Sequence, residues 1–355
     1  MKKLFLILLF SICSVSVASE FFGQKTQHWN APDFTFHTGE SFKELKIGYT
    51  TLGNPTNPAI LILHGTAGSG ERMLDKDFGG ELFGPGQALD ATKFFIILPD
   101  SIGAGKSSKP SDNLRAKFPK YNYDDMVLAQ YRLVTEGLKI SHLRMVLGNS
   151  MGGMHTWLWG IQHPGFMDIL VPMASLPIEM SGRNWIMRRF FIDSIKNDPE
   201  WMEGNYTKQP SSFHFAYTYY SIATNGGTQA IQKQTPTSEI ANQYIKNRMS
   251  APFDADANDY LYQFESSSDY NPTGQLDKIK ARLLVINSAD DERNPTELNA
   301  ITPVLNKIAY SRLFLIPASD QTSGHGTTYK AKWWKDQVQE IINSAPILTN
   351  TSNLR

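Results

Sequence analysis

Residues 146–153, VLGNSMGG, decide the fold of this 355-residue chain. An apolar run ends there at small residues, one serine stands between Gly148 and Gly152, and helix-forming residues follow. Gly-x-Ser-x-Gly between a buried strand and a helix is typical of a nucleophile elbow, a strained turn that lifts the serine hydroxyl above a sheet edge. Such a motif also arises by chance in turns, but this context favours Ser150 as a nucleophile.

The surrounding chain predicts a mostly parallel sheet with helices on both faces. Continuous apolar runs are typical of strands covered on both sides, and they occur at 59–65, 94–100, 144–149, 169–175, 282–288 and 312–319. Longer amphipathic stretches separate them. One is 122–139, where Asn122 is the expected N-cap with Asp125 three residues on. Residues 42–54 are expected to form an antiparallel edge strand.

The strand–helix alternation stops between 176 and 275. This block is rich in Trp, Tyr, Phe and Met and its patterns are mostly helical. We predict a helical cap inserted over the sheet edge, with the core formed by 20–175 and 276–355. A separate second domain is the alternative, but the strand pattern resumes at 282, which favours an insertion.

The first nineteen residues predict a signal peptide. Two lysines precede a short apolar segment at 4–12, and small residues follow. This order is that of a secretory signal, and the apolar part is too short to span a bilayer, which needs roughly 20 residues. We therefore expect a bacterial periplasmic or secreted protein. Cys13 is the only cysteine, so the mature chain would have no disulfide and no thiol nucleophile.

The composition argues against several classes of partner. The chain has 34 basic and 34 acidic residues, so no net field attracts nucleic acid or anionic membranes. The sequence has no second long apolar run, so we do not predict a membrane anchor. The histidines show no metal-ligand spacing, and the phosphate-loop-like segment 103–107 has Asp100 where the first glycine must stand. Neither a metal nor a cofactor is predicted.

A serine hydroxyl needs a base, and the base needs an orienting carboxylate. The chain order expected for this topology is serine, acid, histidine. Of eight histidines, only His325 follows the last predicted strand. The acid should follow the strand at 282–288, where Asp290 and Asp291 are both available. Asp291 is favoured because it stands four residues before Pro295, but Asp290 remains open.

Acyl transfer also needs donors for the oxyanion. The backbone N–H of Met151, directly after the serine, is the first expected donor. The second should come from the loop 64–70, and we predict the N–H of Thr66. His64 is expected to shape this loop rather than to take part in chemistry. The predicted partner is a small-molecule ester or acyl substrate.

Longer blocks extend these motifs. Residues 118–159, FPKYNYDDMVLAQYRLVTEGLKISHLRMVLGNSMGGMHTWLW, and 192–206, IDSIKNDPEWMEGNY, resemble the homoserine O-acetyltransferase branch of the α/β-hydrolase superfamily, over roughly 40–330. The resemblance implies an α/β-hydrolase fold with Ser150, Asp291 and His325 as the triad. It places Thr66 and Met151 at the oxyanion positions.

The chain also departs from that branch. Ile192 stands where the family has an arginine that helps hold the substrate carboxylate, and Gly326 follows His325 where an aspartate is usual. We therefore favour an exported ester hydrolase that works through an acyl-serine. An O-acyltransferase is the alternative, and a non-catalytic binding protein on the same fold is a third hypothesis. The resemblance also implies a possible homodimer through the cap.

Overall fold

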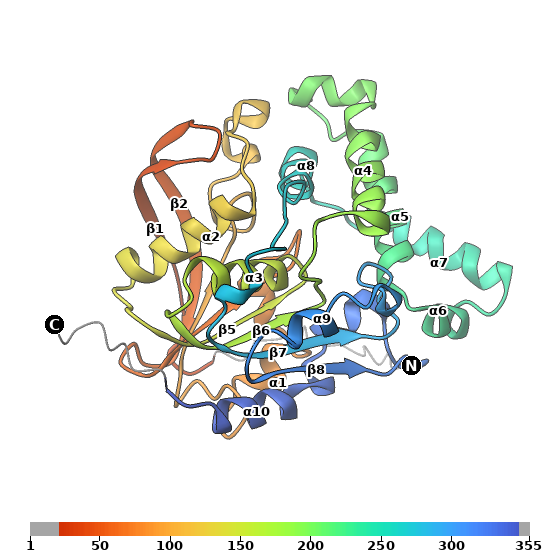
Figure 1. Ribbon diagram of the computed structural model, residues 1–355. Coiled ribbons are helices and arrows are strands. Elements are labelled where there is room, and N and C mark those ends of the chain that lie inside the picture. The colour runs from red at the N-terminus through yellow and green to blue at the C-terminus, as the bar shows by residue number, and fades with distance from the viewer. Residues whose placement is uncertain (1–20, 348–355) are drawn as a thin grey trace, which may run out of the picture.

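The computed structural model describes residues 21–347, so the predicted signal peptide lies outside the described residues. Its centre is one eight-stranded sheet in the order β1-β2-β4-β3-β5-β6-β7-β8 (Figure 1). The strands are β1 Lys25–Thr35, β2 Ser41–Leu52, β3 Ala59–Leu63, β4 Phe95–Pro99, β5 Leu143–Asn149, β6 Met167–Met173, β7 Arg282–Ser288 and β8 Ser311–Ile316. Strands β3 to β8 are parallel. The predicted parallel α/β core is confirmed.

The outermost strand of the sheet was not predicted from the sequence. Residues 42–54 do form an antiparallel strand, β2, but β1 pairs along its outer side. The β1 sequence, KTQHWNAPDFT, is mostly exposed. It therefore lacks the apolar run that marks the buried strands, and this is why the sequence did not reveal it.

Helices cover both faces of the sheet (Figure 1). Helices α2 (Tyr123–Arg132) and α3 (Met151–Gln162) pack on one face in a large apolar cluster with β1 and β2. Helices α1 (Gly79–Leu82) and α10 (Lys335–Ser344) pack on the other, and α9 is Thr302–Leu305. The cap on α2 is as expected: Asn122 Oδ1 accepts from the Asp125 N–H and the Asp125 carboxylate accepts from the Asn122 N–H.

A helical insertion separates β6 from β7, and we call it the cap. It comprises α4 Gly182–Lys196, α5 Ser211–Asn225, α6 Thr228–Gln234, α7 Ser238–Ser250 and α8 Ala257–Glu265. In Figure 1 the cap helices lie above the sheet and to its right. The cap has its own small core, centred on rings such as Phe191, Phe213 and Phe264. The helical insertion is confirmed, whereas its limits at 176 and 275 stay predictions.

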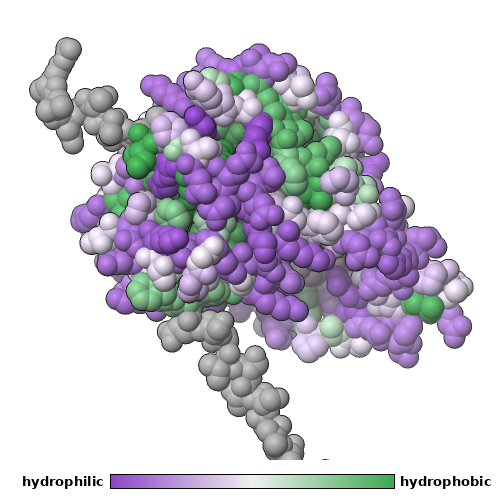
Figure 2. Space-filling view, turned by 90° about the horizontal axis from the view of Figure 1, so that it is seen from below, coloured by the Kyte–Doolittle hydropathy of each residue, from purple (hydrophilic) through white to green (hydrophobic). Residues whose placement is uncertain are grey.

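The surface adds little to the fold assignment. From below, Figure 2 shows a mainly hydrophilic face with smaller apolar areas between the polar ones. On the cap, Phe190 of α4 and Phe215 of α5 are exposed, but the dimer stays a prediction. Within residues 21–347, none of the helices has the length and apolar character that crossing a membrane requires.

Candidate active site

Ser150 lies at the sharp turn between β5 and α3. Its backbone has φ 59° and ψ −113°, a conformation that costs a non-glycine residue free energy and is held only by its surroundings. A Cβ on Gly148 would lie 2.0 Å from the carbonyl oxygen of Gly152, and a Cβ on Gly152 would lie 2.2 Å from that of Leu63. Both distances are below contact, so the close packing of helix against strands requires both glycines.

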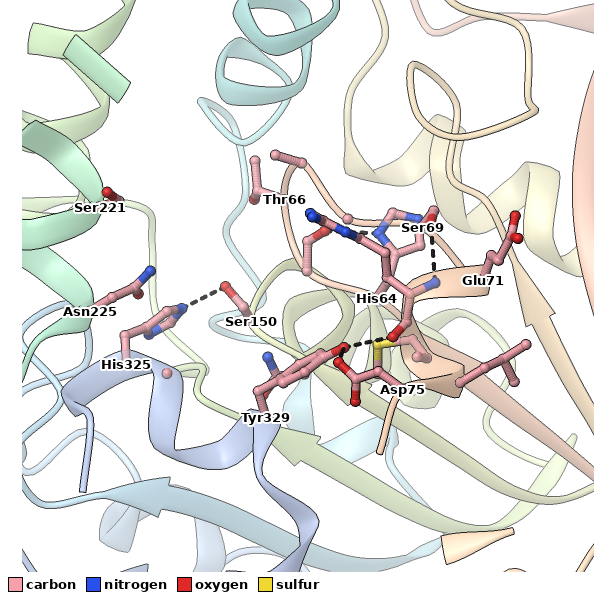
Figure 3. Close-up of a pocket in the computed structure, with 18 of the residues that line it drawn as sticks. His64, Thr66, Ser69, Glu71, Asp75, Ser150, Ser221, Asn225, His325 and Tyr329 are labelled. Atoms are coloured by element: carbon pink, nitrogen blue, oxygen red, sulfur yellow. Dashed lines mark hydrogen bonds between the residues drawn. The ribbon is translucent and has the colours of Figure 1, made fainter. Parts of the chain in front are cut away.

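His325 reaches the serine from a loop 175 residues away in the chain. It lies in a short 3-10 helix, Gly324–Tyr329, after β8, and its ring is 6% exposed. Its Nε2 is 2.7 Å from Ser150 Oγ, a contact drawn in Figure 3. The geometry is that of a base able to accept the hydroxyl proton.

Asp291 holds the other side of the imidazole. Its Oδ2 is 2.8 Å from His325 Nδ1, accepts from Asn294 Nδ2 at 2.9 Å, and its Oδ1 accepts from the Arg293 N–H at 2.8 Å. Burial raises the pKa of Asp291, but its interaction with His325 and these hydrogen bonds outweigh it and hold the pKa below its ordinary value. An ionised Asp291 fixes the Nδ1–H tautomer, which leaves Nε2 to accept from the serine.

The neighbouring carboxylate has a different place. Asp290 Oδ2 accepts from Thr322 Oγ1 at 2.6 Å and from the Gly324 N–H at 3.2 Å. Its Oδ1 accepts from the Ser288 hydroxyl. Asp290 therefore ties the histidine loop to the end of β7, while Asp291 contacts the ring itself.

The surroundings of His325 favour its neutral form. Burial lowers the pKa of His325, Asp291 opposes this, and the nearby charge of Arg293 lowers it further. The net pKa is below the ordinary value of 6.5. A base that is already deprotonated at neutral pH can take up the serine proton without first losing one of its own.

The loop after β3 faces the serine. Figure 3 shows Thr66 above Ser150, on the far side from His325, and Met151 is the first residue of α3. His64 shapes this loop: its Nδ1 is 2.8 Å from the Gly65 carbonyl oxygen, and its Nε2 accepts from the Ser101 N–H at 2.9 Å. Both predicted oxyanion positions thus border the serine, and their role stays a prediction.

A cavity of about 1030 Å³ opens above Ser150. Core and cap both line it: the core contributes the loop after β3 and the His325 loop, and the cap contributes α5 residues such as Tyr220 and Asn225. Within residues 21–347 no group of three His, Cys, Asp or Glu side chains is placed to hold a metal.

The family model of the alpha/beta hydrolase fold matches residues 58–342, and the chain belongs to this family. A probable acyltransferase of Methanothermobacter thermautotrophicus is 26% identical over 84% of this chain and 91% of its own length. The homoserine O-acetyltransferase of Leptospira biflexa is 29% identical over 84% and 92%. An acetylester hydrolase structure from Corynebacterium glutamicum superimposes with a TM-score of 0.77 at 21% identity, covering 90% and 96%.

Two arginines near the triad were not predicted from the sequence. Arg188 of α4 and Arg293, two residues after Asp291, are both buried near the triad. Neither stands at the position of the family's arginine, which Ile192 occupies here. No periodicity or motif distinguishes a buried arginine from a surface one, so only the fold reveals them.

Proposed function

We propose that the protein is a serine-dependent acyl-transfer enzyme that uses water as its preferred acceptor. The observation that carries this proposal is the continuous chain of contacts Ser150–His325–Asp291, with 2.7 Å and 2.8 Å between successive side chains. Structural residues rarely combine a strained serine, a buried neutral imidazole and an ionised carboxylate in one line.

In the first half-reaction Ser150 Oγ attacks the ester carbonyl carbon while His325 Nε2 accepts the hydroxyl proton. Negative charge develops on the carbonyl oxygen, which the backbone N–H groups of Met151 and Thr66 are proposed to stabilise. Collapse breaks the bond to the alcohol oxygen, which receives the proton from His325 and leaves. The product of this step is an ester of Ser150.

In the second half-reaction water takes the place of the alcohol. His325 accepts a proton from water as its oxygen attacks the acyl carbon, and the proton then returns to Ser150 Oγ as the acid is released. An ester and a water molecule thus yield an acid and an alcohol, and the enzyme is regenerated. Asp291 stabilises the imidazolium during both steps.

Two departures from the resembling family support water over homoserine as acceptor. Ile192, at the position of the family's arginine, is buried in the cap's own core and does not line the cavity. Gly326 lines the cavity where an aspartate is usual, so no carboxylate is there for an amino group. The curated relatives named acyltransferases favour the second candidate, an O-acyltransferase with the same acyl-serine.

The test is product analysis with a short-chain acetate ester and purified protein, with and without homoserine. A hydrolase yields free acetate at a rate that homoserine leaves unchanged. Faster formation of acetyl-homoserine than of acetate would establish the second candidate instead. Fluorophosphonate labelling of Ser150 in the same preparation excludes a non-catalytic binding protein, and a folded protein that resists labelling would favour one.

We further propose export to the periplasm or medium. The support is the order of charged, apolar and small residues in 1–19. N-terminal sequencing of protein made from the full-length gene should find a mature end near residue 20, and an intact start at Met1 would contradict it.

A further inference from the structure

Two buried arginines beside the triad have no acidic partner. Arg188 is 1% exposed and Arg293 is 9% exposed. In the part of the chain that the structure describes, neither forms a salt bridge. A guanidinium stays charged at any physiological pH, and burying it without a counter-ion is costly. An anionic ligand would supply the missing charge.

The present contacts of Arg188 are neutral. Its Nε donates to Asn184 Oδ1 at 3.1 Å, its Nη1 to Ser267 Oγ at 3.3 Å, and its Nη2 to Thr66 Oγ1 at 3.5 Å. The last two are long for charge-assisted bonds. Its guanidinium also lies over the Phe264 ring, 5.3 Å from the centroid. The contact with Thr66 places this charge at the loop that faces Ser150.

The guanidinium group of Arg293 makes only some of the hydrogen bonds that it could donate. Its Nη2 donates to Thr224 Oγ1 at 2.6 Å and to Asn225 Oδ1 at 3.3 Å, while its Nε has no partner. The guanidinium lies over the Tyr220 ring at 4.5 Å and borders the cavity. Figure 3 places Asn225 beside His325, so Arg293 approaches the triad from the histidine side. Burial lowers the pKa of Arg293 and the charge of Arg188 lowers it further, while Tyr220 and the carboxylate of Asp291 act in the opposite direction without restoring it.

The charges around the cavity leave one positive charge unbalanced. Of the two arginines only Arg293 lines the cavity, whereas Arg188 and Asp291 lie behind its lining and carry opposite charges. At the other rim the charged lining residues cancel, because Glu71 and Asp75 are matched by Arg72 and Lys76. Figure 3 shows Glu71 and Asp75 on the side away from His325. One excess positive charge fits a monoanion, and planar guanidinium groups bind carboxylates well.

We propose that Arg293, with the second buried charge of Arg188 behind it, forms a carboxylate subsite at the cavity wall that selects esters carrying one negative charge. The inference rests on the proposed acyl-transfer function and names its substrate class. The carboxylate can belong to the acyl part or to the alcohol part of the ester, and the chemistry of recognition is the same in both. Both arginines are specificity-determining residues and take no part in bond making.

Two matched substrate pairs test the subsite with wild-type enzyme. For the acyl part, mono-4-nitrophenyl succinate is compared with its neutral succinamate analogue. For the alcohol part, acetoxyacetate is compared with acetoxyacetamide. In at least one pair the anion should have about ten- to a hundredfold higher kcat/KM, the range of one charge-assisted contact. Equal values in both pairs would overturn the subsite and leave the hydrolase standing.

Variants assign the preference to residues. Arg293→Met should remove most of the anion preference, and Arg293→Lys should restore part of it. Arg189→Met is the matched control, because Arg189 is the next residue of α4 but its side chain is 53% exposed and paired with Asp193. The control should keep the full preference. If Arg293→Met and Arg188→Met both keep it, the proposal fails.

A pH profile separates a charge effect from a merely structural one. Because the charge of Arg293 lowers the pKa of His325, the acid limb for the neutral ester should move to higher pH in Arg293→Met and stay in place in Arg189→Met. An unmoved limb in folded Arg293→Met would place the guanidinium away from the imidazole and contradict the subsite.

Binding tests the subsite even if no ester is turned over. Calorimetry of Ser150→Ala should detect the anions acetoxyacetate or monomethyl succinate, but not the matched neutral amides acetoxyacetamide and methyl succinamate. Binding that is lost in the double variant Ser150→Ala, Arg293→Met supports the subsite. Absence of anion binding to folded Ser150→Ala overturns it, whereas lack of turnover together with unlabelled Ser150 rejects the proposed function alone.

Discussion

The core and the cap meet above Ser150, but they contribute by different physical means. The core positions chemistry through its backbone: a strained turn, strand ends at one edge, and loops tied down by Asp290 and His64. The cap contributes side chains on helices packed around their own small core, among them Arg188. If the proposed function holds, the reaction belongs to the sheet edge, while selection among substrates is shared between Arg293 of the core and Arg188 of the insertion.

The largest effect should come from the core. Ser150→Ala removes the nucleophile, so we expect kcat for a chromogenic ester to fall by about 10⁴–10⁶, with the far-ultraviolet circular dichroism unchanged. His325→Ala should cost about as much, because the two residues act as a unit. Activity above a tenth of wild type in folded Ser150→Ala would break the assignment of chemistry to the sheet edge.

The two neighbouring aspartates should differ sharply. Asp291→Asn forces the wrong imidazole tautomer and should lower kcat by about 10⁴. Asp290→Asn keeps the shape of a group that anchors the histidine loop through Thr322 and Gly324, so its loss should be much smaller. Steady-state kinetics of both variants decides the matter, and a larger loss in Asp290→Asn would reverse the assignment.

A methyl group at the elbow should damage the core's stability. In Gly152→Ala the new Cβ would meet the Leu63 carbonyl oxygen, so we expect the free energy of unfolding to fall by about 1–3 kcal/mol or more. Gly165→Ala is the control, because its Cβ would have no neighbour within 4 Å. Urea unfolding measures both, and equal stability of the two variants would argue against the tight helix–strand approach.

The contact between Asp259 of the cap and Ser111 of the core should have the smallest effect, and it should appear in the free energy of unfolding. Asp259 of α8 accepts from the N–H and hydroxyl of Ser111 at 2.8 Å and 2.6 Å, and burial raises its pKa to about 6. A raised pKa means that the protonated carboxyl stabilises the fold at low pH and that this stabilisation is lost as pH rises through 6.

The measurement compares wild type with Asp259→Asn, an isosteric variant that does not titrate. Between pH 7 and pH 5 the free energy of unfolding of wild type should rise relative to the variant by about 1 kcal/mol. Parallel pH profiles would show that Asp259 titrates normally, and the cap would then be attached through a wetter seam than the structure indicates.

Burial also explains which parts of the fold and of the candidate site could be predicted from the sequence. The six parallel strands and the helical insertion could be predicted because a fully buried strand must be continuously apolar. The exposed strand β1 could not, since its residues lack that requirement. Ser150 and His325 followed from motif and chain order, and the structure brings them within 2.7 Å. Arg188 and Arg293 carried no local signal.

The elbow could be identified from the sequence alone, because the Gly-x-Ser-x-Gly motif lies in one short segment between an apolar run and a helical stretch, and so could the order of the three candidate catalytic residues. The tertiary structure alone decided which of two adjacent aspartates faces the imidazole and which charges remain unpaired above the serine. The reason is that the Gly-x-Ser-x-Gly motif is complete within five residues, whereas burial, electrostatic balance and the contact of Gly152 with the Leu63 carbonyl oxygen depend on residues that only folding brings together.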